Sequence, residues 1–130
     1  MISEQLKKAL KEGKELVKSN ENLYENANSY VMKNNPKIAK RLIEQGALSR
    51  IFNYKSVHNY KPKELISLLG KPHFKFNDLY SSWCLKLDNG LLFLLSEKEQ
   101  GTAVEMTGTD ENTIQQAVSF YNELLNLISE

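Results

Sequence analysis

The sequence predicts a single α+β domain over residues 1–130, with helices first, an antiparallel sheet next and a helix last. Apolar residues recur every three or four positions in the first half of the chain. They alternate with polar residues from Leu79 to Leu87, and the helical period returns after Asp110. Helices and strands that are segregated in this order favour an antiparallel sheet with helices packed on it. A chain of 130 residues is long enough to bury one core.

Four helices are predicted in the N-terminal half. The first spans Ile2 to Val17, and Gly13 is expected to be a soft point because glycine has a low helix propensity. The second spans Asn22 to Met32. Proline suits the first helical position and glycine suits the position after the last, which predicts helices from Pro36 to Gln45 and from Pro62 to Leu69.

The strands are predicted to form a three-stranded antiparallel meander. The first strand is Leu79 to Leu87, where the alternation is typical of a half-buried strand. Asn89-Gly90 predicts a two-residue hairpin turn, because both residue types tolerate a positive φ. Leu91–Leu95 and Thr102–Thr107 are then the second and third strands.

The hairpin turn sets which apolar side chains share a face of the sheet. A two-residue turn at Asn89-Gly90 places Leu87 opposite Leu92. One face then holds Trp83, Leu85, Leu87, Leu92 and Leu94. The other face holds Phe93 and Leu95. Either helices cover both faces, or Phe93 and Leu95 stay partly open and dock a partner.

The last helix has the clearest pattern. Asp110 is suited to cap it, and Glu111 places negative charge at the positive end of the helix dipole. A single apolar stripe follows, made of Ile114, Ala117, Val118, Tyr121, Leu124, Leu125 and Ile128. We therefore expect an amphipathic C-terminal helix packed on the sheet.

The charge is close to balanced over the whole chain but unevenly placed. The formal net charge is +1, yet residues 31–72 hold nine Lys or Arg against two Glu, and residues 101–130 hold five acids and no base. The first residues lack the pattern of a signal peptide, and no apolar run is long enough to cross a bilayer. With a single cysteine in the chain, these features predict a cytoplasmic protein that does not associate with membranes.

The side chains that carry chemistry are few and dispersed. Cys84 is the only thiol, and His58 and His73 are the only imidazoles, at a spacing that matches no familiar metal site. Asp78 and Asp88 bracket one predicted strand, which separates them too far to share a proton. Neither a dinucleotide fingerprint nor a Walker spacing is present. The sequence therefore predicts no catalytic residue, no cofactor and no metal.

The basic middle of the chain is the main candidate for partner binding. It mixes cations with flat rings that suit stacking or interface burial. These residues are Arg50, Tyr54, Lys55, His58, Tyr60, Lys61 and Lys63. The alternative is that the lysines only solvate a loop and its flanking helices.

These patterns favour a non-catalytic binding protein that sequesters or inhibits a macromolecular partner, with a protein as the expected partner. Bacterial immunity proteins and antitoxins have this size and simplicity, and they serve as an analogy of class. The first alternative is a nucleic-acid-binding or regulatory module that uses residues 50–63. The second is an enzyme with a dispersed site, such as a hydrolase that uses His58 or His73. The sequence makes no prediction of oligomeric state.

Overall fold

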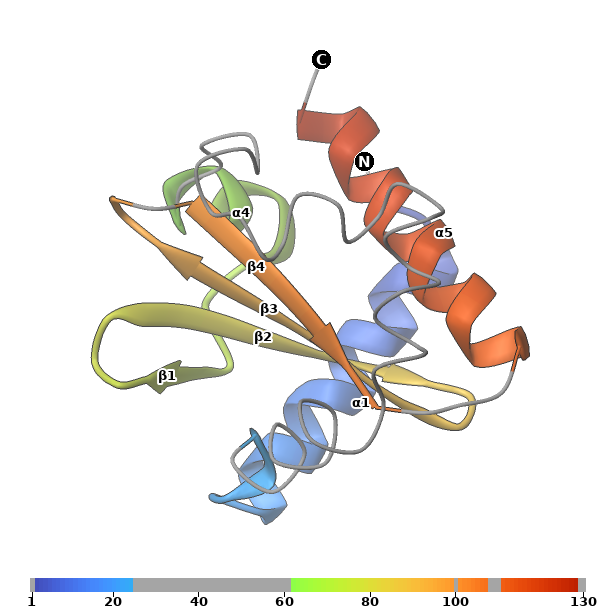
Figure 1. Cartoon of the computed structure of the whole chain (residues 1–130), viewed down its shortest axis with the longest axis horizontal. Helices are drawn as coiled ribbons and strands as arrows, with labels where there is room; N and C mark the ends of the chain where they lie inside the picture. The colour runs from blue at the N-terminus through green and yellow to red at the C-terminus, as the bar shows by residue number, and fades with distance from the viewer. Residues whose placement is uncertain (1, 25–61, 100, 108–110, 129–130) are drawn as a thin grey trace.

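The computed structural model describes residues 2–24, 62–99, 101–107 and 111–128 and has an α+β fold, as predicted (Figure 1). The four strands make one antiparallel sheet in the order β1-β2-β3-β4. The helices are α1 (Glu4–Ser19), α4 (Pro62–Leu69) and α5 (Glu111–Ile128), and the strands are β1 (Phe74–Phe76), β2 (Tyr80–Leu87), β3 (Gly90–Glu97) and β4 (Gly101–Met106). The helix predicted at 36–45, and most of the one at 22–32, lie outside the described residues.

Strand β1 was not predicted, so the meander has four strands where three were expected. Its three residues are too few to show an alternating pattern. The turn that follows has positive φ angles at Asn77 (52°) and Asp78 (56°), and the Leu79 N–H donates to the Phe76 carbonyl at 3.2 Å. Positive φ at both central residues with this hydrogen bond is typical of a type I′ turn, and Leu79 is the third residue between the paired Phe76 and Tyr80. Leu79 therefore lies on the turn rather than in a strand, and its side chain is 64% exposed.

The predicted register of the central hairpin is wrong, but the predicted faces are right. Leu85, rather than Leu87, lies opposite Leu92, and Leu87 pairs with Gly90. The two turn residues are thus Asp88 and Asn89. The partner of each residue has shifted by two positions. Because side chains alternate with a period of two, this shift leaves every side chain on its predicted face.

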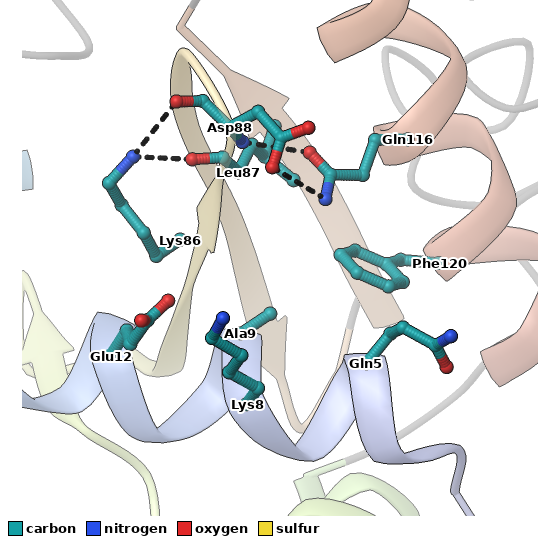
Figure 2. Close-up of a pocket in the computed structure, with 9 residues that line it drawn as sticks. All are labelled: Gln5, Lys8, Ala9, Glu12, Lys86, Leu87, Asp88, Gln116 and Phe120. Atoms are coloured by element: carbon teal, nitrogen blue, oxygen red, sulfur yellow. Dashed lines mark hydrogen bonds between the residues drawn. The ribbon is translucent and has the colours of Figure 1, made fainter.

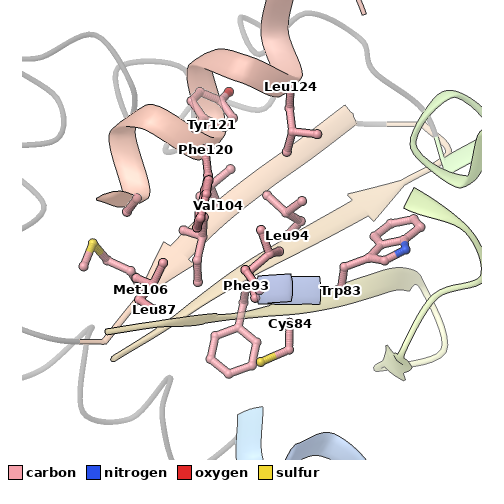
Figure 3. Packing of buried hydrophobic residues seen from close by; sticks show 14 of the residues in the cluster. Trp83, Cys84, Leu87, Phe93, Leu94, Val104, Met106, Phe120, Tyr121 and Leu124 are labelled. Atoms are coloured by element: carbon pink, nitrogen blue, oxygen red, sulfur yellow. The ribbon is translucent and has the colours of Figure 1, made fainter. Parts of the chain in front are cut away.

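The first face, here called the leucine face, consists of Trp83, Leu85, Leu87, Leu92 and Leu94, all at most 1% exposed. Figure 3 shows side chains of α5, among them Phe120 and Leu124, pointing toward this face. The indole N–H of Trp83 donates to the Gly70 carbonyl at 3.2 Å, which fixes the end of α4 to β2. The apolar side of α5 thus covers the leucine face of the sheet, as the spacing of its apolar residues predicts.

The opposite face is also closed, by aromatic packing. Tyr24 follows α1, and its ring centroid lies 4.4 Å from that of Phe76 and 5.2 Å from that of Phe93. Its hydroxyl donates to Glu105 at 2.7 Å. Phe93 and Leu95 are only 1% and 2% exposed. The suggestion that these two side chains dock a partner is therefore corrected, since covers on both faces remove them from solvent.

Helix α1 runs without a break through Gly13, the position where the sequence predicts a soft point. The reason for glycine there is a close approach to β2. A Cβ at position 13 would lie 1.9 Å from the Cys84 carbonyl oxygen. Only a residue without a side chain lets the helix backbone approach the strand this closely. At the start of α1, Ser3 accepts a hydrogen bond from the Leu6 N–H and caps the helix.

Candidate partner-binding site

A groove of about 430 Å³ lies between α1, the β2–β3 hairpin and α5 (Figure 2). We call it the α1–hairpin groove. Its lining comes from three parts of the chain that are far apart in sequence. The lining residues are Gln5, Lys8, Ala9, Glu12, Lys86, Leu87, Asp88, Gln116 and Phe120. The folded chain therefore assembles a surface that no single segment contains.

Helix α1 supplies one wall of the groove. Its lining residues have the spacing i, i+3, i+4 and i+7, which places them on one side of a helix. The side chains of Gln5, Lys8 and Glu12 form no hydrogen bond or ion pair with another described residue. Lys8 precedes Glu12 by four positions, which is the less favourable order for an ion pair on a helix. This wall offers an amide, a cation and a carboxylate that are all available to a ligand.

The hairpin turn forms the opposite wall, and its charges are already engaged. The Lys86 ammonium donates to the carbonyls of Leu87 and Asp88. The Asp88 N–H donates to Gln116 Oε1 at 2.8 Å, and Gln116 Nε2 lies 3.5 Å from Asp88 Oδ1. Gln116 is part of α5, so these contacts fix the turn to that helix. The groove thus has one wall whose charged side chains have no partner among the described residues and one whose charged side chains are hydrogen-bonded to the protein.

The floor of the groove is apolar. It is formed by Ala9, Leu87 and Phe120, which are 3%, 1% and 5% exposed. An apolar centre with a polar rim is the usual anatomy of a protein interface. The walls are also held in place, because the Ser3 N–H and hydroxyl donate to the Glu123 carboxylate at 2.7 and 2.8 Å and so join α1 to α5.

Cys84 and His73, two of the residues considered above as candidates for chemistry, contribute to packing and hydrogen bonding in the structure. Burial raises the pKa of the Cys84 thiol to about 12, an effect that nearby Lys86 partly offsets. Burial, together with the charge of Lys14, lowers the pKa of His73 to about 4. The Cys84 N–H donates to His73 Nδ1 at 3.0 Å, so the neutral ring carries its proton on Nε2. The Cys84 thiol and the His73 imidazole are therefore both neutral at pH 7, and the ring nitrogen that could accept a proton already accepts a hydrogen bond from the Cys84 N–H.

A row of lysines on the outer side of α1 is a second candidate surface. The residues are Lys7, Lys11, Lys14 and Lys18, which are spaced at i, i+4, i+7 and i+11 and are all exposed. The structure gives one ion pair to this row, between Lys7 and Glu4 at 3.4 Å. Counting charge by segment did not reveal the row, because residues 1–30 hold equal numbers of Lys and Glu. The helical spacing, which was already visible in the sequence, was the signal that could have found it.

Of the residues predicted to bind a partner, Lys63 is the one that the structure describes on the surface. It is exposed in the first turn of α4. The others in the basic middle lie outside the described residues: Arg50, Tyr54, Lys55, His58, Tyr60 and Lys61. Phe93 and Leu95 lie in the core. The structure therefore places only Lys63, Phe93 and Leu95 of the predicted set, and the lining of the α1–hairpin groove contains none of these three.

Searches against protein-family models, curated proteins and solved structures found no match to this chain. Among the described residues, no helix is both long enough and apolar enough to span a membrane. The same residues contain no group of three or more His, Cys, Asp or Glu side chains placed to hold a metal ion. The argument for function therefore starts from the surfaces described above.

Proposed function

We propose that this protein is a non-catalytic binding protein that sequesters or inhibits a macromolecular partner, most simply another protein, in the manner of bacterial immunity proteins and antitoxins. The α1–hairpin groove carries this proposal. It combines an apolar floor with three polar side chains, Gln5, Lys8 and Glu12, that have no partner among the described residues. Polar groups on a folded surface that surround a buried apolar centre suit recognition by contact.

The groove is preorganised for binding. Hydrogen bonds join both of its walls to α5, through Ser3 and Glu123 on one side and through Asp88 and Gln116 on the other. A partner therefore binds without first ordering these elements. Since ordering side chains and loops on binding costs free energy, a preformed groove retains more of the contact energy as affinity.

The contacts expected in such a complex follow from the lining. An apolar side chain of the partner packs on Ala9, Leu87 and Phe120, while opposite charges meet Lys8 and Glu12. Both charges gain an opposite charge in the complex, so neither is buried without compensation. The apolar anchor supplies most of the affinity and the charges select the partner.

The test is purification of the intact chain with its partner from the source cell, identification of that partner, and calorimetry on the purified pair. The groove variant exchanges two charges, Lys8→Glu with Glu12→Lys, and the matched control exchanges Lys11→Glu with Glu15→Lys outside the groove lining. We expect one stoichiometric protein partner, with its Kd weakened about tenfold or more by the first exchange and little by the second. The proposal is wrong if no stoichiometric macromolecular partner is found.

A nucleic-acid-binding or regulatory role is the second candidate, and the lysine row of α1 is the observation that favours it. Exposed cations at a helical spacing can contact successive phosphates along one strand. The expected binding weakens as salt rises, and its salt slope falls by about one for each phosphate contact removed. Titrating DNA and RNA with the original chain and with the variants Lys11→Glu and Lys18→Glu, at several salt concentrations, measures the salt slope of binding. Absence of binding at low salt would exclude this role.

A further inference from the structure

We infer that the α1–hairpin groove binds a short extended segment of the partner polypeptide, which forms main-chain hydrogen bonds with Lys86 on the open edge of β2. This inference rests on the proposed binding function and names the mode of recognition. Three features of the described structure carry it: the way the edge of β2 is closed, the direction of the Lys86 main chain, and the unpaired charges on α1.

The outer edge of β2 changes its partner along its length. Strand β1 pairs with it only as far as Ser82, whose carbonyl accepts from the His73 N–H at 2.8 Å. The Cys84 N–H then donates to the imidazole of His73, and the Cys84 carbonyl abuts Gly13 of α1. Two residues further on, Lys86 is the next residue whose main chain can point to this edge.

The main chain of Lys86 points away from β3. Lys86 lies opposite Leu91, and the N–H and carbonyl of Leu91 are both taken by Thr107 on the β4 side. The Lys86–Leu91 pair is therefore a pair without hydrogen bonds between β2 and β3. Its N–H and carbonyl face the side of β2 on which α1 lies, and no described residue pairs with them there. An extended chain is the ligand that offers a matching donor and acceptor.

Helix α1 places one cation and one carboxylate in the same groove as Lys86. These are the side chains of Lys8 and Glu12, which lie one turn apart on the helix. The Lys86 ammonium is bound to main-chain carbonyls and the Asp88 carboxylate lies against Gln116, which leaves Lys8 and Glu12 to select the ligand. We therefore expect a segment that contains an acidic and a basic residue.

The probe is a displayed library of random octapeptides, selected on the intact chain, from which one enriched peptide is synthesised. The expected consensus contains an acidic and a basic residue. Hydrogen exchange read by NMR gives the direct evidence. In the free protein the Lys86 amide exchanges fast while the amides of Leu85 and Leu87 are protected, and saturating peptide slows Lys86 exchange about tenfold or more. Unchanged exchange at Lys86 on peptide binding would overturn the inference.

Two substitutions at one position separate the main chain from the side chain. Lys86→Ala keeps the N–H, whereas Lys86→Pro removes it at an edge position where proline is tolerated. We expect peptide and partner to bind Lys86→Ala nearly as well as the original and to bind Lys86→Pro at least tenfold more weakly. Equal binding of the two variants contradicts this mode yet leaves the binding function intact, while the lack of any macromolecular partner contradicts the function itself. Should Lys86→Pro fail to fold, the exchange of the Lys86 amide decides.

Discussion

The outer edge of β2 is covered in different ways along the two halves of the strand. In the first half, Tyr80 to Ser82, the outer main-chain groups pair with β1 as in any antiparallel ladder. In the second half, an imidazole, a glycine in a helix and then a groove take the place of that strand. The comparison teaches that different elements can close successive parts of one strand edge, and that this closure ends at the α1–hairpin groove in the part of the chain that the structure describes.

The largest effect is expected where the helix meets the second half of β2. In a helix interior, Gly→Ala normally stabilises by about 1 kcal/mol. Here Gly13→Ala would place a Cβ 1.9 Å from the Cys84 carbonyl oxygen, so α1 must move away. We expect a loss of roughly 3 kcal/mol in the free energy of unfolding, measured by urea denaturation. Lys11→Ala, at an exposed site of the same helix, is the control, and a stabilised Gly13→Ala variant would contradict the close approach.

The next effect tests whether the His73 ring replaces a strand partner. His73→Ala leaves the buried Cys84 N–H without its acceptor, which costs about 1 to 3 kcal/mol. His73→Asn retains an acceptor near the position of Nδ1 and should recover a large part of that loss. Urea denaturation of both variants measures the difference. Equal stability of the two variants would mean that the hydrogen bond contributes nothing.

A smaller effect follows from pH. The pKa of His73 is about 4 in the folded protein, below the ordinary value of 6.5. A base with a lowered pKa favours the fold fully above pH 6.5, and this stabilisation is lost as pH falls toward 4. Since the ring is partly exposed, we expect about 1 kcal/mol over this window. His73→Asn should reduce this dependence of stability on pH, measured by thermal denaturation at several pH values. Burial raises the pKa of Glu105, which acts in the opposite sense and remains in both proteins.

The smallest effect on stability is expected at the turn between β1 and β2. Asp78 has a φ of 56°, a region that favours glycine. Asp78→Gly relieves this strain but also loosens the unfolded chain, so the expected net gain is about 0.5 kcal/mol. Differential scanning calorimetry should show a slightly higher Tm. Asp88→Gly, at the turn of the second hairpin, is the contrasting control and should lower the Tm by removing the contact to Gln116.

Much of the fold was predictable because it depends on local periods. The alternation from Leu79 predicted β2 to within one residue, and the proline and glycine signals predicted α4 as Pro62–Leu69. The faces of the sheet were also predicted correctly, although the register was not. Burial depends on the parity of a side chain along the strand, and parity survives a shift of two residues. Strand β1 was missed because it is short and is held by its pairing with β2.

Little of the candidate site was predictable, because it joins three separate segments. Residues 5–12, 86–88 and 116–120 each have an ordinary local pattern, and only packing brings them around one groove. The residues favoured from the sequence were chosen for their chemical type. Of these, Phe93 and Leu95 serve the core, and Lys63 alone lies on the described surface. A mixture of cations and rings in a segment does not indicate where that segment packs.

By itself the sequence determined the periods of the helices and strands, and with them the side on which each apolar residue lies. It did so because these depend on neighbours a few positions away along the chain. The tertiary structure alone decided that Gly13 meets Cys84, that His73 pairs with the edge of β2, and that no described residue pairs with the outer main chain of Lys86. These contacts join residues from different elements, and their geometry exists only once α1, β2 and α5 have packed together.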